Sequence, residues 1–152
     1  MENSKVVSIL NTLIEISRDG ASGFKTCAEG AKDVGLRAFF QTRVRQCEEA
    51  VRELNAEVRR YGADPDASGS VTGTLHRAWV NIRTALTSND DLAVLEECER
   101  GEDAALAAYR EALKEDLPKE LTPLIQKQYE GAKENHDRVR NMRDARKHAN
   151  AA

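Results

Sequence analysis

Three side chains on two expected helices have the types and spacing to bind a metal ion: Glu99, Glu102 and His136. Both glutamates fall on the apolar stripe of the helix expected over 89–116, where a carboxylate needs a partner because an unpaired buried charge is costly. If the following turn is centred on Leu117, antiparallel pairing places Glu99 beside His136, with Glu102 about one turn, or ~5 Å, away. Carboxylate and imidazole groups bind iron, manganese and zinc, so the three side chains are a candidate site for one of these metals.

The same two glutamates also fit a simpler interpretation, in which they lie at the edge of the stripe. There they would be solvated or paired with an arginine, and Arg100 and Arg138 are available on the two helices. A slightly rotated stripe keeps Glu102 buried but replaces Glu99 with Cys98. Both interpretations therefore stay open at the level of the sequence.

Helical periodicity predicts an all-α four-helix bundle in a single domain. Apolar residues recur every three or four positions in four long segments, and Asp33 is a suitable N-cap between the first two. Pro118 is acceptable in the first turn of the last helix. The expected helices cover residues 4–32, 34–61, 89–116 and 118–147, with a short helix over about 74–86 and a frayed tail at 148–152.

The connection between the second and third long helices decides the topology. Residues 63–73 are rich in Asp, Ser and Gly, which is the composition of a loop. This loop and the short helix over 74–86 can together span the ~45 Å length of a bundle, giving one long crossover and two short hairpins. The alternative is an up-down-up-down order, in which the short helix only covers one end of the bundle.

His76 and Trp79 belong to this connection. We expect Trp79 to anchor the short helix on the bundle and His76 to make a local hydrogen bond; alternatively, both line a small-ligand pocket beneath the crossover. Gly20 and Gly23 fall inside the first helix, where glycine costs roughly 1 kcal/mol relative to alanine. We therefore expect a neighbouring helix, or a bulky side chain such as Phe40 or Trp79, to approach these glycines closely.

Composition and charge argue against several classes of partner. The formal net charge is −3, so no global basic field attracts nucleic acid. No apolar run approaches the ~18 residues of a transmembrane helix, and we expect no membrane partner. Cys27, Cys47 and Cys98 are odd in number, and the first residues lack the layout of a signal peptide. We therefore expect reduced thiols and a cytoplasmic location.

Four segments of the chain together resemble a known protein family. They read DGASGF at 19–24, SGSVTGTLHRAW at 68–79, NDDLAVLEECERGED at 89–103 and NHDRVR at 135–140. Over about residues 7–143 the chain is similar to a bacterial family of small ferritin-like four-helix-bundle proteins that carries a domain of unknown function. The resemblance implies the ferritin-like fold with its long crossover, and it implies no established activity.

The ferritin-like superfamily also implies a metal site that this chain can build only in part. A ferritin-like di-iron site takes a glutamate from each of two helices and a Glu-x-x-His pair from each of the other two. Here Lys133 stands three residues before His136, and the helix over 34–61 has no histidine. Ser17 and Gly20 occupy the first-helix positions where a carboxylate would be needed. One chain therefore cannot supply a complete site of the usual kind.

These observations lead to three functional hypotheses. The first is a non-enzymatic interaction or stress-associated protein with a degenerate metal site, a candidate homodimer with an unidentified protein partner. The second is a metal-binding protein that holds iron, manganese or zinc with Glu99, Glu102 and His136, alone or with a second subunit. The third is a small-ligand binder that uses His76 and Trp79.

Overall fold

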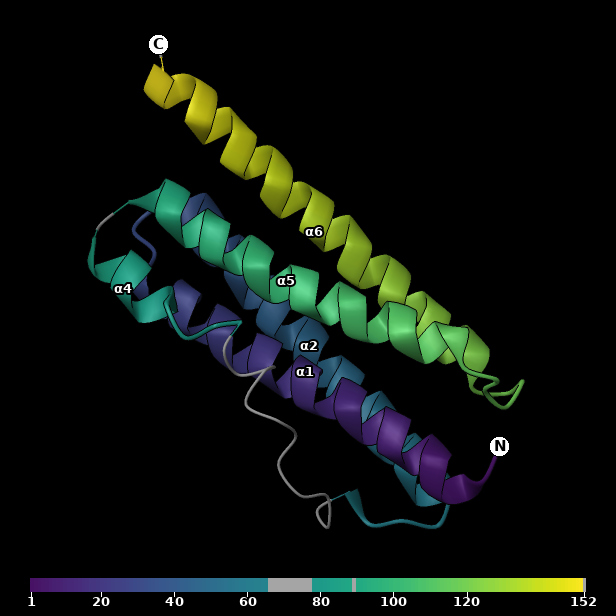
Figure 1. The fold of residues 1–152 in the computed structure, drawn as a ribbon. Helices are drawn as coiled ribbons and strands as arrows, with labels where there is room; N and C mark the ends of the chain where they lie inside the picture. The colour runs from purple at the N-terminus through teal and green to yellow at the C-terminus, as the bar shows by residue number, and fades with distance from the viewer. Residues whose placement is uncertain (66–77, 89, 152) are drawn as a thin grey trace.

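The computed structural model describes residues 1–65, 78–88 and 90–151. Its helices are α1 (Asn3–Gly30), α2 (Val34–Arg60), α4 (Ile82–Thr87), α5 (Asp91–Lys114) and α6 (Thr122–Ala151), shown in Figure 1. These described ranges contain no strand, which confirms the prediction of an all-α bundle. No helix in this part of the chain is long and apolar enough to cross a membrane.

The expected N-cap of α2 is present. The Asp33 side chain accepts a hydrogen bond from the Leu36 amide at 2.9 Å, which satisfies one of the free amides at the helix start. The short helix is less extensive than expected, because α4 begins at Ile82. The part of it that was predicted over residues 74–77 lies outside the described residues.

The last helix is shifted towards the C-terminus relative to its predicted bounds. It begins at Thr122 rather than Pro118 because the chain first makes a turn, in which the Pro118 carbonyl accepts hydrogen bonds from the Leu121 and Thr122 amides. It then continues to Ala151, through most of the tail that was expected to fray. The start of α6 therefore follows the local hydrogen bonds rather than the position of the proline.

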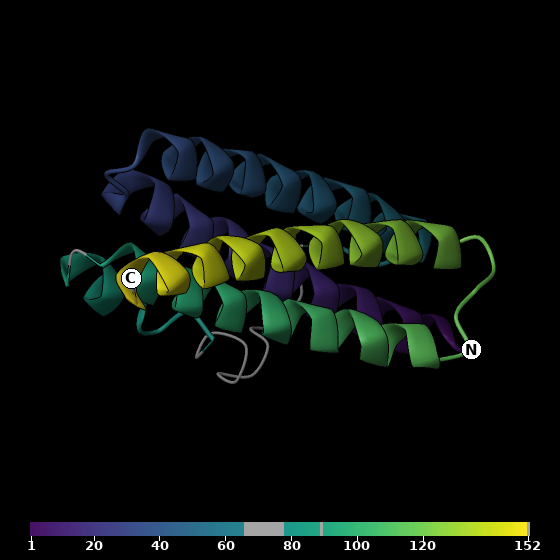
Figure 2. The same cartoon turned by 90° about the horizontal axis from the view of Figure 1, so that it is seen from above.

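Two hydrophobic clusters fill the two ends of the bundle. The first cluster includes Phe24, Phe40, Trp79, Leu95 and Val139. The second cluster includes Val6, Leu10, Leu54, Tyr109 and Ile125. From the order of these residues along the chain, α2 and α5 run from the first cluster to the second, and α1 and α6 run in the opposite direction (Figures 1 and 2). α2 thus ends beside the start of α1, whereas α4 and α5 begin near the end of α1 (Figure 1).

Trp79 lies between α1 and α5 at the centre of the first cluster. A Cβ atom added to Gly23 of α1 or to Gly101 of α5 would overlap the Trp79 ring. The ring also packs edge-on against Phe24, with centroids 5.0 Å apart. This arrangement confirms the expectations for Trp79 and Gly23. At Gly20 the close neighbour is the Cys47 thiol, 3.1 Å from where a Cβ would be.

Candidate functional site

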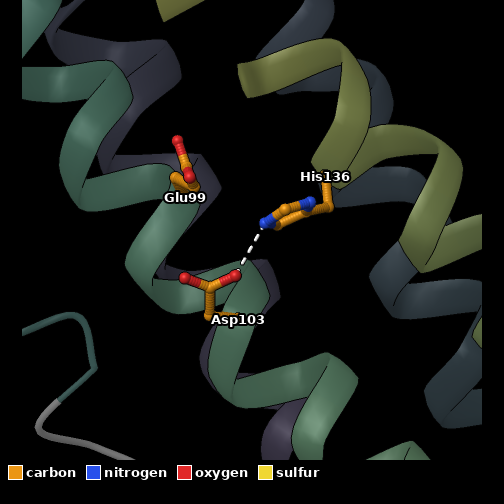
Figure 3. A group of neighbouring side chains, drawn as sticks. All are labelled: Glu99, Asp103 and His136. Carbon is orange, nitrogen blue, oxygen red and sulfur yellow. Dashed lines mark ion pairs between the residues drawn. The ribbon is translucent and has the colours of Figure 1, made fainter. Parts of the chain in front are cut away.

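Glu99 and His136, two of the three predicted metal-binding residues, lie together between α5 and α6. Asp103, which was not predicted, lies beside them. One donor atom from each of Glu99, Asp103 and His136 lies within 4.8 Å of the others (Figure 3). The Nε2 atom of His136 is 2.6 Å from an Asp103 carboxylate oxygen. Glu99 and Asp103 are four residues apart on α5, so they share one face of that helix. The same spacing was the signal in the sequence that could have identified Asp103.

Glu102 lies apart from this cluster, in the centre of the bundle. Its carboxylate accepts two hydrogen bonds from Arg43 of α2, from Nε at 3.0 Å and from Nη2 at 3.2 Å. The side chains of Arg43 and Glu102 are 7% and 2% exposed, so the ion pair is removed from water. Glu102 is therefore paired with an arginine, as the simpler interpretation of the sequence allowed. The partner is Arg43, however, and neither Arg100 nor Arg138.

The Arg43–Glu102 pair is part of a larger polar network that extends to the exposed residue Gln46. The Nη1 atom of Arg43 donates a hydrogen bond to Gln46 at 2.7 Å, and the Asn135 amide donates to the same Gln46 oxygen at 3.1 Å. The Arg43 guanidinium also lies 5.0 Å from the centroid of the Phe24 ring, within the range of a cation–π contact. Each guanidinium nitrogen of Arg43 therefore has a hydrogen-bond partner.

Burial shifts the pKa values of the ionisable groups in and beside this network. Desolvation raises the pKa of Glu102, and the Arg43 charge and hydrogen bonds oppose that rise. For Arg43, burial acts to lower the pKa, but Glu102, Cys47 and Tyr109 together outweigh burial, so the pKa is raised. The buried thiol of the neighbouring Cys47 has its pKa raised to about 11, mainly by desolvation. The directions of these pKa shifts indicate that little water reaches the Arg43–Glu102 pair, whose two opposite charges compensate each other.

Glu99 has a cationic neighbour in Arg143 of α6. The Nη1 atom of Arg143 donates to a Glu99 carboxylate oxygen, while its Nε and Nη2 atoms donate to Asp144 at 3.1 and 2.9 Å. Arg143 would therefore keep two hydrogen bonds if Glu99 turned towards another cation. The cluster of Glu99, Asp103 and His136 thus has two carboxylates, one imidazole and a cation that already has a second partner.

Trp79, one of the two residues of the predicted small-ligand site, lies beside a cavity at the surface of α1. Trp79 lines a cavity of about 300 Å³ with Asp19, Ser22, Thr26 and Arg83, next to the start of α4. His76 lies outside the described residues. A role for His76 beside Trp79 therefore stays a prediction.

Comparison with known proteins identifies the family of this chain. A family model with the description "Domain of unknown function (DUF2383)" matches residues 5–115. These residues include α1, α2, α4 and α5, and therefore Arg43, Glu99, Glu102 and Asp103. All of α6, including His136, lies beyond the match. No curated protein matches the chain.

Proposed function

This chain belongs to the DUF2383 family, and we propose that it is a ferritin-like bundle that binds one divalent metal ion at Glu99, Asp103 and His136. The observation that carries the proposal is the convergence of one imidazole and two carboxylates from α5 and α6 (Figure 3). Three protein ligands leave further coordination positions for water or a partner's ligand. Two negative carboxylates and a neutral imidazole match the charge of a divalent cation.

The order of the helices supports the ferritin-like part of the proposal. α1 pairs with α2 and α5 with α6, and α2 runs parallel to α5. Two hairpins joined between opposite ends of the bundle are the arrangement of ferritin-like folds with one long connection. The proposed metal lies between the helices of the second hairpin.

The size of the cluster is suitable for a first-row metal after small side-chain movements. Zinc-to-oxygen and zinc-to-nitrogen bonds of ~2.0–2.2 Å require donor atoms roughly 3.4 Å apart in a tetrahedral site. The donors now lie within 4.8 Å of one another, and the Asp103 side chain is 62% exposed. Carboxylate and imidazole ligands suit zinc, manganese and iron, so we propose one of these three metals.

Glu102 has a different role in this proposal from the one predicted from the sequence. Its charge is compensated by Arg43, which provides a positive charge at the centre of the bundle without a metal. The half of a di-iron site that α1 and α2 would supply is occupied by Ser17, Gly20, Arg43 and Cys47, which line the central cavity. We therefore propose a single-metal, non-enzymatic protein. An interaction or stress-associated role and a homodimer stay predictions.

The metal content of the untagged full-length protein tests the proposal. The protein is dialysed against Zn(II), Mn(II) or Fe(II) in turn, and metal is measured by elemental analysis. We expect about one equivalent of at least one metal, and a loss of at least tenfold in retained metal in His136→Gln and in Asp103→Asn. Glu96→Gln is the matched control, because Glu96 is an exposed acid on the same helix.

Two results would overturn the metal proposal. The first is retention of less than a tenth of an equivalent of all three metals by the parent protein. The second is retention by His136→Gln and Asp103→Asn equal to that of Glu96→Gln, since the ion would then lie elsewhere. Circular dichroism of each variant shows whether a loss of metal comes with a loss of helix.

A further inference from the structure

Two hydrogen-bonded rungs join α2 to α6. In the first rung the Asn135 amide donates to Gln46 at 3.1 Å, and in the second the Gln128 amide donates to Glu53 at 3.3 Å. Gln46 and Glu53 are seven residues apart, as are Gln128 and Asn135, so the rungs are two turns, or ~10.5 Å, apart. α2 and α6 run in opposite directions, as Figure 2 shows.

Small residues occupy the interval between the two rungs. Ala50 of α2 and Gly131 and Ala132 of α6 lie there, and a Cβ added to Gly131 would have no atom within 4 Å. The helices are therefore joined at the rungs and open between them. A cavity of about 510 Å³ enters the bundle at this opening and extends to Ser17 of α1 and Glu102 of α5.

The inner wall of the cavity is both polar and aromatic. The buried polar or charged residues of the described chain are Ser17, Arg43, Glu102 and Asn135, and all four line the cavity. Phe24 and Trp79 also line it. A pocket of this volume with a few inward polar groups and aromatic walls is typical of a small-molecule site.

The Arg43–Glu102 pair restricts the charge of a ligand. An anion that bound Arg43 would compete with Glu102, and a cation that bound Glu102 would compete with Arg43. Either ligand would leave a buried charge without its partner, which is strongly unfavourable. An uncharged ligand can instead bind the amide nitrogen of Gln46 and the amide oxygen of Asn135, a donor and an acceptor that the rungs do not use.

We infer that this cavity binds one uncharged, planar heteroaromatic molecule with hydrogen-bonding edges. The cavity of about 510 Å³ has room for a molecule of three fused rings, and the slot between two helices favours a flat shape. The amides of Gln46 and Asn135 bind the edges of the molecule, and Phe24 and Trp79 contact its apolar surface. This site shares no ligand residue with the proposed metal cluster.

Fluorescence titration of the full-length protein with riboflavin and with lumichrome tests this inference. Trp79 is the only tryptophan of the sequence and lines the cavity, so its emission reports occupancy. We expect saturable quenching by at least one probe with one site per chain. Gly131→Leu fills the opening at a position without nearby atoms, and we expect it to weaken binding at least tenfold without loss of helix.

Lys133→Leu is the matched control, because Lys133 is exposed on α6 and does not line the cavity. We expect this variant, and Asp103→Asn from the metal cluster, to bind the probes as the parent protein does. Absence of saturable quenching with both probes would overturn the inference. Equal binding by Gly131→Leu and Lys133→Leu would also overturn it, because the probe would then bind outside the opening.

Discussion

Arg43 of α2 and Glu102 of α5 form a two-point ion pair at the centre of the bundle, with nitrogen-to-oxygen distances of 3.0 and 3.2 Å. Removing one partner of such a pair leaves a buried charge, which costs about 3–5 kcal/mol, whereas replacing both partners by apolar residues is often neutral or stabilising. We therefore expect Glu102→Leu to lose about 3–5 kcal/mol of unfolding free energy. We expect the double variant Arg43→Met/Glu102→Leu to be within about 1 kcal/mol of the parent, or more stable.

Urea denaturation followed by circular dichroism measures both effects. The comparison requires equal denaturant dependence in the three proteins, which shows that the unfolding transition is the same. A Glu102→Leu variant as stable as the parent would mean that Arg43 reaches water or another partner when Glu102 is absent. That result would contradict the buried, compensated pair described above.

Replacement of glycine by alanine should have opposite effects on stability at Gly101, which contacts Trp79, and at Gly131, which has no atom nearby. Gly101→Ala would force the added methyl group against the Trp79 ring, and overpacking of this kind costs about 1–3 kcal/mol. Gly131→Ala adds the same methyl group in open space inside a helix, where alanine is favoured by up to about 1 kcal/mol. Thermal denaturation should therefore lower the Tm of the first variant and raise that of the second. Two Tm shifts of the same sign would contradict this packing.

The buried thiol of Cys47 makes the stability of the fold depend on pH in the alkaline range. Burial raises the pKa of its thiol from 9.0 to about 11, so between these values the folded chain keeps a proton that the unfolded chain has lost. Stability should therefore fall as pH rises from about 9 to 11, and Cys47 should contribute roughly 2 kcal/mol of that fall. Denaturation of the parent and Cys47→Ala across this range measures the contribution. Equal slopes for the two proteins would be the contrary result.

If the metal proposal is correct, Arg143 competes with the ion for Glu99. Arg143 donates to Glu99 and also to Asp144 in the structure. Arg143→Gln removes a positive charge beside the cluster, and we expect it to strengthen Zn(II) binding by about tenfold, which corresponds to about 1.4 kcal/mol. Isothermal titration calorimetry measures this difference. Arg140→Gln is the control, because Arg140 pairs with Asp137 on the same helix rather than with the cluster.

The helices could be predicted because their apolar residues repeat with the helical period. Arg43 could not, because the same period admits either residue 43 or residue 44 on the buried stripe. Hydrophobicity alone favours Val44, yet the structure buries Arg43 to 6% exposure and leaves Val44 partly exposed. The choice depends on the carboxylate of Glu102, which is 59 residues away in the sequence and reaches Arg43 only after folding.

The candidate metal site shows a similar limit. Register in the hairpin brought Glu99 close to His136, as the distance from the turn predicted. The orientation of α5 about its own axis then decided whether residue 102 or residue 103 would face α6. A rotation of one residue is 100°, and it depends on packing against α1 and α2 that a hairpin alone does not specify.

The Trp79 ring between Gly23 and Gly101 has a consequence for how related sequences can diverge. A side chain smaller than tryptophan would leave a void between α1 and α5, and larger residues in place of the two glycines would fill it. A change at one of these three positions therefore alters the selection on the other two. Among relatives that keep this packing, the three positions should covary, although they lie 56 and 22 residues apart along the chain.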